Sequence, residues 1–423
     1  MKPRIVIIGG GAAGAWMLLR LLRGVDGIDI VEPRDALGRG LAYSAQSDKH
    51  LLNVTTPKMD TYAEADDPLF EPWLAARADH DYAPRRLYGD FLTEAVSKAI
   101  AGKDVRHFRT MASAIRSTDD RLAVTLADGR TLTASHAVLA LGNLPPQFLA
   151  PGVSDPRIIE HPWSLTPERA EGRDRVVIAG TGLTALDAVT LIAEANPKAH
   201  FTLAAAHPLT PPCDRTVTPW AEAEHVIGHS PAAVWGMTKR ELSQRDWYEV
   251  VDGLRGHVET IWTSWTPNQR RSFMRHGARL WLHHRHRSPP PTWCRIEELR
   301  AAGRLSLRAG RIHRLTPHPD RIDVDLATGT LAADLVVNTT GPSLSLRTHV
   351  LLSALLDAGL VTECPLGLGI AIDDDGRCRT RDGQPSRLFA LGTLTRGQFF
   401  ETVAVPHIRR RAGDIADVIV NSS

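Results

Sequence analysis

Two glycine-rich segments, each placed directly after a short apolar run, constrain the fold of this 423-residue chain more than any other feature. The first spans residues 9–14 after the β-branched run 5–8, and the second spans residues 180–185 after the run 176–179. A buried parallel strand that ends in such a turn and continues into a helix is the nucleotide-binding unit of Rossmann folds. Because the units lie roughly one domain length (about 100–200 residues) apart, they predict an α/β chain with two Rossmann-like domains.

The first segment has every part that the motif requires. Gly9 permits the tight turn, Gly11 lets the backbone approach a pyrophosphate, and Gly14 lets the following helix pack closely on the strand. Glu32 ends the next apolar run, where a carboxylate accepts hydrogen bonds from the hydroxyls of a ribose. The alternative is an ordinary strand–turn–helix with chance glycines. We expect this unit to bind a dinucleotide.

The second segment differs from the first at two positions. Ala185 stands where the third glycine would be, and the next strand, residues 200–206, ends without a carboxylate. An acid there would repel a 2′-phosphate, so its absence favours NADPH over NADH. His207 and Arg215 are the nearest cations for that phosphate. The alternative is a structural remnant that binds nothing.

Two dinucleotide sites in one chain suit a flavin enzyme that a nicotinamide coenzyme reduces. We therefore predict FAD at the first segment and NADPH at the second, with NADH less favoured. The residues predicted to bind FAD are Gly9, Gly10, Gly11, Ala12, Ala13, Gly14 and Glu32, and those predicted to bind NADPH are Gly180, Thr181, Gly182, Leu183 and Thr184.

Composition narrows the class of protein further. A formal net charge of +2 and a pI near 8.4 argue against an electrostatic footprint for nucleic acid. No segment has the ~20 apolar residues of a membrane span, and glycines interrupt the apolar N-terminus before any signal-peptide cleavage pattern. We expect a cytoplasmic protein with a small-molecule substrate.

The cysteines and histidines exclude two further chemistries. The four cysteines include no Cys-x-x-Cys pair, which argues against a dithiol that exchanges with a flavin. The histidines of residues 283–286 lack further ligands at a suitable spacing, so no metal site is expected.

An unusual block between residues 220 and 293 holds seven of the ten tryptophans, with many arginines and histidines. Its helix-like spacing at residues 239–254 and 267–283 predicts a helical insertion in the second domain. One explanation of this composition is structural: the helices pack on each other with stacked guanidinium groups, or they form a homodimer contact. The other explanation is a surface that binds substrate. For the second explanation, Arg285 and Arg287 are the candidate ligands of a substrate carboxylate or phosphate.

Motifs that run nearly end to end carry a resemblance to a known family. They are residues 9–14, 38–44, 50–54, 84–89, 139–142, 180–185, 338–341, 388–397 and 401–409. The chain resembles the FAD-NAD(P)-binding flavoproteins that are related to the N-hydroxylating and flavin-containing monooxygenases. The resemblance implies an FAD domain of residues 1–165 and 335–423, and an NAD(P)H domain of residues 166–334 with a helical insertion at about 211–300.

The resemblance also implies further site residues. Gly142, Gly392, Thr393 and Val405 would contact FAD, and backbone amides near Val405 would face the flavin where a reduced flavin carries negative charge. His161, Trp163 and Asn53 are candidates for a catalytic or coenzyme-positioning role.

The function implied is an FAD-dependent, NADPH-reduced monooxygenase that uses O2 to oxygenate a nitrogen or another soft atom of a small metabolite. Such chemistry does not require a catalytic side chain, and we assign none. The alternatives are an NAD(P)H-dependent reductase with a protein or quinone acceptor, and a redox-responsive binding protein.

Overall fold

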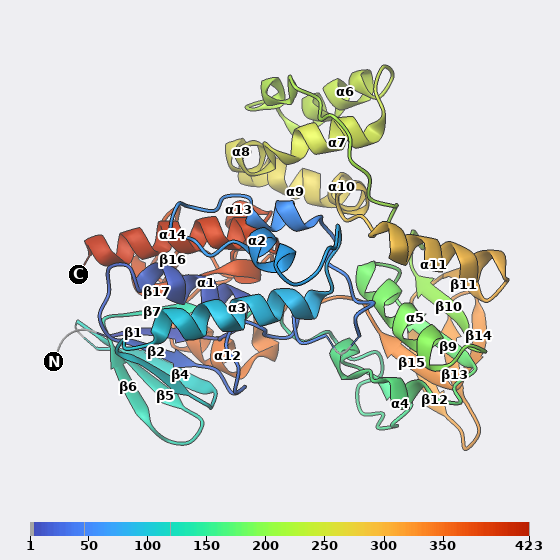
Figure 1. Ribbon diagram of the computed structural model, residues 1–423, viewed down its shortest axis with the longest axis horizontal. Helices are drawn as coiled ribbons and strands as arrows, with labels where there is room; N and C mark the ends of the chain where they lie inside the picture. The colour runs from blue at the N-terminus through green and yellow to red at the C-terminus, as the bar shows by residue number, and fades with distance from the viewer. Residues whose placement is uncertain (1–3, 46, 119, 423) are drawn as a thin grey trace.

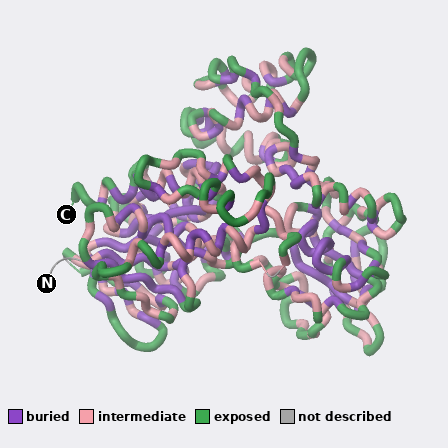
Figure 2. Tube along the Cα trace, viewed as in Figure 1, coloured by how far each residue is buried: buried purple, intermediate pink, exposed green. Residues whose placement is uncertain are grey.

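The computed structural model describes residues 4–45, 47–118 and 120–422 and contains three lobes (Figure 1). Two of them are built on largely parallel sheets, whose central strands are buried (Figure 2). The third is helical and lies above the other two in Figure 1. None of the described helices is long and apolar enough to cross a membrane. The predicted α/β fold class is confirmed.

The first lobe is built on a six-stranded sheet of order β16-β17-β7-β1-β2-β3. All neighbours are parallel except β16 and β17, which pair antiparallel. The strands are β1 (Ile5–Ile8), β2 (Ile28–Val31), β3 (Val105–Phe108), β7 (His136–Leu139), β16 (Arg377–Arg379) and β17 (Pro385–Ala390). The parallel strands end at one edge of the sheet, so the residues that follow them are brought together there.

Helices cover one face of this sheet, and a small antiparallel sheet with one helix covers the other. The first face packs on α1 (Ala12–Leu21), α3 (Arg85–Ile100) and α14 (Val405–Asn421). The second packs on β4 (Ala112–Ser117), β5 (Leu122–Leu126), β6 (Thr131–Ala134) and α12 (Val350–Asp357). The short helices α2 (Phe70–Ala75) and α13 (Arg396–Phe399) complete the lobe.

The second lobe repeats this plan with a five-stranded parallel sheet of order β11-β10-β9-β15-β8. Its strands are β8 (Ile158–Ile159), β9 (Arg175–Ala179), β10 (His200–Ala205), β11 (Leu305–Ala309) and β15 (Leu335–Asn338). One face packs on α5 (Leu183–Ala195) and α11 (Pro290–Ala301). The other packs on the meander β12 (Ile312–Pro317), β13 (Ile322–Leu326) and β14 (Gly329–Ala333). The four-residue α4 (Pro167–Ala170) also contacts α5.

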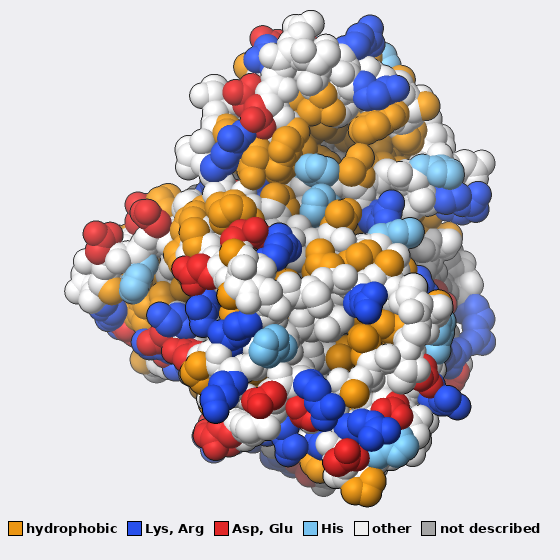
Figure 3. All heavy atoms as spheres, turned by 90° about the vertical axis from the view of Figure 1, so that its right-hand side faces the viewer, with side chains coloured by type: hydrophobic (Ala, Val, Ile, Leu, Met, Phe, Trp, Pro, Cys, Tyr) orange, Lys and Arg blue, Asp and Glu red, His pale blue; other side chains and the backbone are white. Residues whose placement is uncertain are grey.

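The helical lobe lies in the sequence between β10 and α11. Its helices are α6 (Pro231–Glu241), α7 (Trp247–Arg255), α8 (Val258–Ser264), α9 (Pro267–His276) and α10 (Ala278–Arg285). In Figure 3, hydrophobic side chains surround a hollow in one face of this lobe, with histidines below it. Residues 290–301, which we expected in the insertion, form α11 and pack on α5.

The helical lobe rests on the first lobe, although the sequence inserts it into the second. The rings of Trp262 and Phe400 stack with centroids 4.7 Å apart. The indole Nε1 of Trp262 donates a hydrogen bond of 3.2 Å to the carbonyl oxygen of Gly397. These contacts join α8 to α13 and bury an aromatic cluster between the two lobes.

Two helices predicted as continuous are broken. The stretch 239–254 is interrupted where α6 ends at Glu241, and α7 begins at Trp247 after its N-cap Asp246, whose carboxylate accepts a hydrogen bond from Tyr248 N. The stretch 267–283 is two helices, α9 and α10, that meet at Gly277.

Candidate functional site

The glycine turn after β1 is tightly packed against neighbouring backbone. Gly9 has a φ of +105°, and a Cβ there would lie 2.3 Å from the carbonyl oxygen of Ala140. A Cβ on Gly14 would lie 1.9 Å from the carbonyl oxygen of Gly9. The fold itself therefore requires glycine at both positions, independently of any ligand.

Gly11 and Gly182 occupy equivalent positions, as the N-caps of α1 and α5. Their backbones are extended, with φ/ψ of −69°/−167° and −78°/−172°, which any residue adopts. A Cβ on Gly182 would meet nothing within 4 Å, whereas one on Gly11 would lie 3.3 Å from Gly40 Cα. No side chain caps either helix. The free amides and the open space at Gly182 fit a pyrophosphate that approaches the backbone.

Glu32 lies buried at the end of β2, beside this turn. Its Oε2 accepts a 2.8 Å hydrogen bond from Gly10 N, and its Oε1 accepts bonds from Arg34 N and Nη1 at 3.1 and 3.0 Å. Since a carboxylate accepts about four hydrogen bonds, Oε2 retains an acceptor site. That site fits the ribose hydroxyl for which Glu32 was predicted.

Predicted FAD residues from distant parts of the sequence lie together at this edge of the sheet. The Thr393 hydroxyl donates a hydrogen bond to the carbonyl oxygen of Gly142. A Cβ on Gly392, whose φ is +80°, would lie 3.9 Å from the Cβ of Ala13. The sheet order explains the convergence, because β7 lies between β1 and β17.

The start of α14 borders the same region. Val405 is buried in one cluster with Ala13 at the start of α1. No side chain caps α14, and its first turn contains Pro406, which has no N–H to leave unpaired. The buried Thr402 hydroxyl has no hydrogen-bond partner among the described residues. These free amides and the orphan hydroxyl fit a polar, electron-accepting ring.

One of the two cations predicted near the second glycine turn already has an acidic partner. Thr181 Oγ1 donates a 2.8 Å hydrogen bond to Leu209 O, which fixes the loop after β10. Arg215 pairs with Asp246 and lies over the Tyr248 ring at 4.0 Å, so its charge is used within the protein. His207 is exposed near the end of β10.

Sequence reasoning missed one cation in this region. Arg308 lies on β11, opposite Ala204 of β10, and is exposed. The two residues are more than one hundred positions apart in the sequence, and only the pairing of β10 with β11 brings them together. Arg308 and His207 are the cations that could face a 2′-phosphate.

Three of the family motifs meet where the first lobe contacts α5. Arg85 Nη2 lies 2.9 Å from Asp187 Oδ2, and Arg85 Nε donates a 2.9 Å hydrogen bond to Leu51 O. His50 Nε2 lies 3.2 Å from the carbonyl oxygen of Asp187, and burial lowers the pKa of His50. These residues belong to the motifs at 50–54, 84–89 and the helix after 180–185, so the motifs also hold the lobes together.

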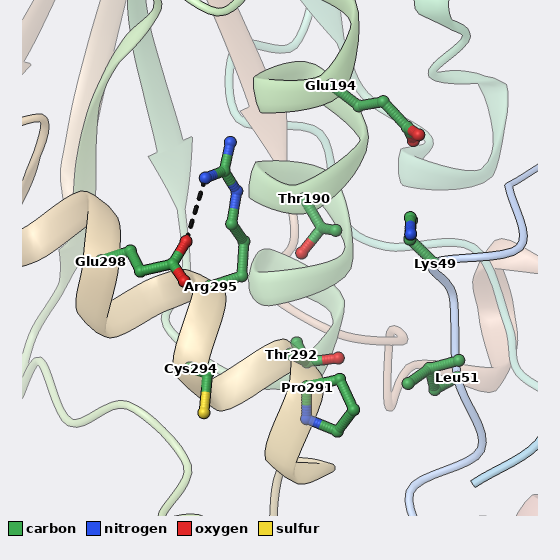
Figure 4. Close-up of a pocket in the computed structure, with 9 residues that line it drawn as sticks. All are labelled: Lys49, Leu51, Thr190, Glu194, Pro291, Thr292, Cys294, Arg295 and Glu298. Atoms are coloured by element: carbon green, nitrogen blue, oxygen red, sulfur yellow. Dashed lines mark hydrogen bonds and ion pairs between the residues drawn. The ribbon is translucent and has the colours of Figure 1, made fainter.

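A cavity of about 410 Å³ opens beside this contact (Figure 4). Lys49 and Leu51 line one side, Thr190 and Glu194 of α5 another, and α11 the third. Its lining includes no glycine of either turn. We therefore do not place the redox chemistry there.

The remaining catalytic candidates stay predictions. His161 is exposed, and its ring makes an edge contact with that of Phe148, with centroids 5.8 Å apart. Trp163 lies in the short 3-10 helix Pro162–Ser164 that follows, and Asn53 lies in the loop after Leu51. None of their described contacts joins them to either glycine turn.

Arg285 and Arg287, the predicted substrate ligands, have partners within the protein. Both are buried, and each has an acidic partner: Arg285 Nη2 donates to Glu401 Oε2 at 3.1 Å, and Arg287 pairs with Asp252 at 2.8 Å. Arg287 also lies 3.4 Å from Asp214. Their guanidinium groups thus bind carboxylates of the protein, and direct contact of either arginine with substrate stays a prediction.

Comparison with known families finds a match within the first lobe. A family model described as FAD-NAD(P)-binding matches residues 6–144, which include the first glycine turn, Glu32 and Gly142. No curated protein sequence matches the chain significantly.

Solved structures match along the whole chain. The ornithine N-hydroxylase of Kutzneria sp. 744 has a TM-score of 0.70 at 18% identity, with 100% of both chains covered. The L-lysine 6-monooxygenase of Pseudomonas syringae has a TM-score of 0.68 at 19% identity, again over 100% of both chains. The bacillithiol disulfide reductase of Bacillus cereus has a TM-score of 0.62 at 14% identity, also with 100% of both chains covered. Residues 6–144 therefore match an FAD-NAD(P)-binding family, and the whole chain has the fold of flavoproteins with two dinucleotide-binding domains, as its motifs predicted.

Proposed function

We propose that the protein is an FAD-dependent, NADPH-oxidising monooxygenase that oxygenates a nitrogen or another soft atom of a small molecule. The observation that carries the proposal is the pair of uncapped helix N-termini, at Gly11 and Gly182, in a chain that matches amino-acid N-hydroxylases over its full length. The proposed FAD domain is residues 1–165 and 335–423, and the proposed NADPH domain is residues 166–334.

The residues of the chain would bind and orient the two cofactors. Backbone amides at Gly11 and Gly182 would bind the two pyrophosphates. Glu32 would bind the adenosine ribose of FAD. Thr393, beside Gly142, would contact the ribityl or pyrophosphate chain of FAD. The amides that open α14 would stabilise negative charge on a neighbouring ring. When bound, the flavin would take a hydride from NADPH and pass its two electrons to oxygen.

The overall reaction balances without another reductant. One NADPH, one proton, one O2 and one substrate give NADP⁺, one water and one oxygenated product. The protein must keep water from the reacting atoms, and the helical lobe that packs on α13 is placed to do so.

Reductase activity is the second candidate, and the likeness to a bacillithiol disulfide reductase favours it. The described cysteines supply little support for a protein dithiol. Cys364 and Cys378 are buried, and burial raises the pKa of the Cys378 thiol, which opposes thiolate formation. An external disulfide or quinone would have to accept the electrons.

Coupled consumption of NADPH and O2 tests the proposal. L-ornithine, L-lysine and simple primary amines are added in turn to the FAD-loaded protein, and NADPH loss, O2 loss and hydroxylated product are measured together. A monooxygenase consumes one NADPH and one O2 per product. NADPH oxidation that continues under argon with a disulfide or quinone, without amine-dependent O2 uptake in air, would replace it with the reductase.

A further inference from the structure

The chain between β17 and α14 meets the edge of the first sheet twice, at the region proposed for FAD. Near its first end, Thr393 donates a hydrogen bond to the carbonyl oxygen of Gly142. At its second end, Val405 is buried in one cluster with Ala13 of α1. Its middle, residues 397–401, contacts the helical lobe instead. The helical lobe therefore holds a connection whose two ends carry predicted FAD residues.

Phe400, in the middle of this connection, has a backbone conformation that side chains rarely adopt. Its φ and ψ are +61° and −59°, and Glu401 N donates a 2.7 Å hydrogen bond to Phe399 O across it. This is a γ-turn of the strained kind, with positive φ. The one other non-glycine residue with positive φ among the described residues is Tyr62, whose ring makes an edge contact with that of His407 in the first turn of α14. Strain of this kind persists only where the surrounding structure enforces it, and it concentrates at functional sites.

Aromatic contacts from the helical lobe enclose this turn. The ring of Trp262, on α8, stacks on that of Phe400, and its Nε1 donates a 3.2 Å hydrogen bond to the carbonyl oxygen of Gly397. The ring of Phe273, on α9, makes an edge contact with that of Phe400, with centroids 5.6 Å apart. Phe400 is only 4% exposed. One tryptophan thus fixes both the backbone before the turn and the side chain at its centre.

The residue after the turn, Glu401, is held by the same lobe. Its carboxylate accepts hydrogen bonds from Arg285 Nη2 at 3.1 Å and from Trp281 Nε1 at 3.3 Å, and both donors belong to α10. Because a buried carboxylate needs such partners, the position of Glu401 depends on α10. Residues 397–401 are thus held through three helices of the lobe, α8, α9 and α10.

A second connection runs from α8 to α14 itself, and the two helices lie close together in Figure 1. Glu259 pairs with Arg410 and Arg411, and its side chain is 18% exposed. Glu259 and Trp262 are three positions apart on α8, so both side chains lie on one face of that helix. This face therefore contacts the turn at Phe400 and the second turn of α14 at the same time.

We propose that the helical lobe positions the FAD-binding segment, with Trp262 and Glu259 as its positioning residues. By holding the turn at Phe400, they would fix the first turn of α14, whose uncapped amides are proposed to face the flavin. Neither residue needs to touch the cofactor. This inference rests on the proposed function, because it requires FAD at this edge of the first sheet. It gives a role in FAD binding to a lobe that the sequence inserts into the proposed NADPH domain.

Trp262→Phe and Trp265→Phe form a matched pair of variants. Both tryptophans are buried in one aromatic cluster, and each indole donates one hydrogen bond to a backbone carbonyl. The acceptor of Trp262 is Gly397, outside the lobe, whereas that of Trp265 is His229, inside it, at 2.8 Å. Both variants keep an aromatic ring, so their melting temperatures should fall by similar amounts. Only Trp262→Phe should loosen the connection that leads to α14.

Titration of the full-length apoprotein with FAD, followed by flavin fluorescence, measures the effect. We expect Trp262→Phe to raise the dissociation constant about three- to ten-fold, as one lost hydrogen bond allows, and Trp265→Phe to change it less than about two-fold. The midpoint potential of bound FAD should also fall in Trp262→Phe, because displaced amides stabilise the negative charge of the reduced ring less. A fall of about 10–30 mV corresponds to a two- to ten-fold loss for the reduced relative to the oxidised form. Equal dissociation constants and potentials in the two variants would overturn the proposal.

Glu259→Gln and Glu241→Gln form a second matched pair, which decides the question even if Trp262→Phe does not fold. Glu241 pairs with Arg245 inside the helical lobe, at 3.1 Å, whereas Glu259 pairs with α14. Glu259→Gln should raise the dissociation constant of FAD about two- to five-fold, because partly exposed ion pairs are weak. Glu241→Gln should bind FAD as the wild type does, and equal binding by the two variants would refute the role of Glu259.

The outcome of these titrations is independent of the reaction that the enzyme performs. They consume no NADPH, substrate or O2, so a failure of the monooxygenase assay is distinguishable from a failure of this inference. Wild-type apoprotein that binds no FAD would refute the FAD site and this inference with it. Wild-type protein that binds FAD, with each variant equal to its control, would refute the positioning role alone.

Discussion

Arg85 of α3 and Asp187 of α5 form an ion pair, 2.9 Å from Nη2 to Oδ2, that connects the two Rossmann-like lobes. Both side chains are largely buried, with exposed fractions of 15% and 12%. The adjacent Arg86 instead pairs with the exposed Asp48 on the surface of the first lobe. Neighbouring arginines thus provide a matched pair for experiment.

We expect Arg85→Ala to destabilise the protein by about 1–3 kcal/mol, because it leaves the Asp187 carboxylate without its cation in a largely buried contact. Flavin reduction by NADPH should slow as well, since the lobes lose a fixed contact. Arg86→Ala should cost less than about 1 kcal/mol, as exposed pairs do. Urea denaturation and rapid-mixing kinetics measure the two effects, and similar losses in both variants would refute the interpretation.

Gly182→Val separates coenzyme binding from folding. The backbone at Gly182 suits any residue and its Cβ direction is empty, so the variant should fold with a full complement of FAD. Its side chain would fill the space proposed for the pyrophosphate, and reduction by NADPH should fall at least about 100-fold, the effect of losing about 2.7 kcal/mol of binding. Visible absorbance gives the flavin content. Normal reduction would show that the second turn binds no coenzyme.

Gly11→Val should instead yield protein without flavin. Its Cβ would lie only 3.3 Å from Gly40 Cα, and the rest of the side chain would enter the space proposed for the FAD pyrophosphate. Purification with bound FAD would contradict the assignment of the first turn.

The preference for NADPH over NADH should depend on His207 and Arg308, the cations near the end of β10. We expect NADPH to reduce the flavin up to about 100-fold faster than NADH, as one or two well-placed charged contacts allow. A double variant with His207→Gln and Arg308→Gln should remove most of that difference, because flavin reduction by NADPH becomes slower while reduction by NADH keeps its rate. An unchanged ratio of the two rates would exclude these residues from recognition of the 2′-phosphate.

His136 should make the protein less stable in mild acid. Burial, with the nearby charges of Arg377 and Arg387, lowers the pKa of His136 to about 4, against 6.5 for the ordinary side chain. Between these values the unfolded chain binds a proton that the folded chain does not, so stability falls as the pH drops from 6.5 to 4. The contribution is about 1–3 kcal/mol over the window, at about 1.4 kcal/mol per pH unit.

His136→Phe should flatten that pH dependence, because it removes the titrating group and keeps a ring against Phe389. The urea midpoint measured from pH 7 to pH 4 checks the result. His313→Phe, at an exposed position of β12, is the control and should leave the slope as it is. An equal slope in the two variants would mean that His136 does not cause the acid sensitivity.

The sequence was sufficient for elements whose determinants are local. The β-branched runs before Gly9 and Gly180 predicted strands in the sheets where they are found, because a buried parallel strand needs little beyond such a run and its turn. The breaks in the helical lobe were also local, at the N-cap Asp246 and at Gly277, but the strong helical spacing around them concealed both.

The candidate site depends on contacts that no local pattern contains. Arg285 pairs with Glu401, which is 116 positions away in the sequence, and Arg287 pairs with Asp214, which is 73 positions away. Composition identified a cation-rich block, but only the fold shows which carboxylates its arginines pair with. Pairing of side chains over such distances is set by the packing of whole lobes.

The attachment of the helical lobe has a consequence for motion. Its two connecting segments hydrogen-bond to each other, Asp214 N to Ser288 O at 2.7 Å and Ser288 N to Pro212 O at 2.8 Å, and Tyr82 of the first lobe donates to Asp214. They form a double-stranded neck that a hydrogen bond from Tyr82 fastens to the first lobe. If the coenzyme lobe swings to admit NADPH or release NADP⁺, the bending must fall between this neck and the second sheet. The helical lobe would then move together with the first lobe, and the contact of Trp262 with Phe400 would be kept during each exchange of coenzyme.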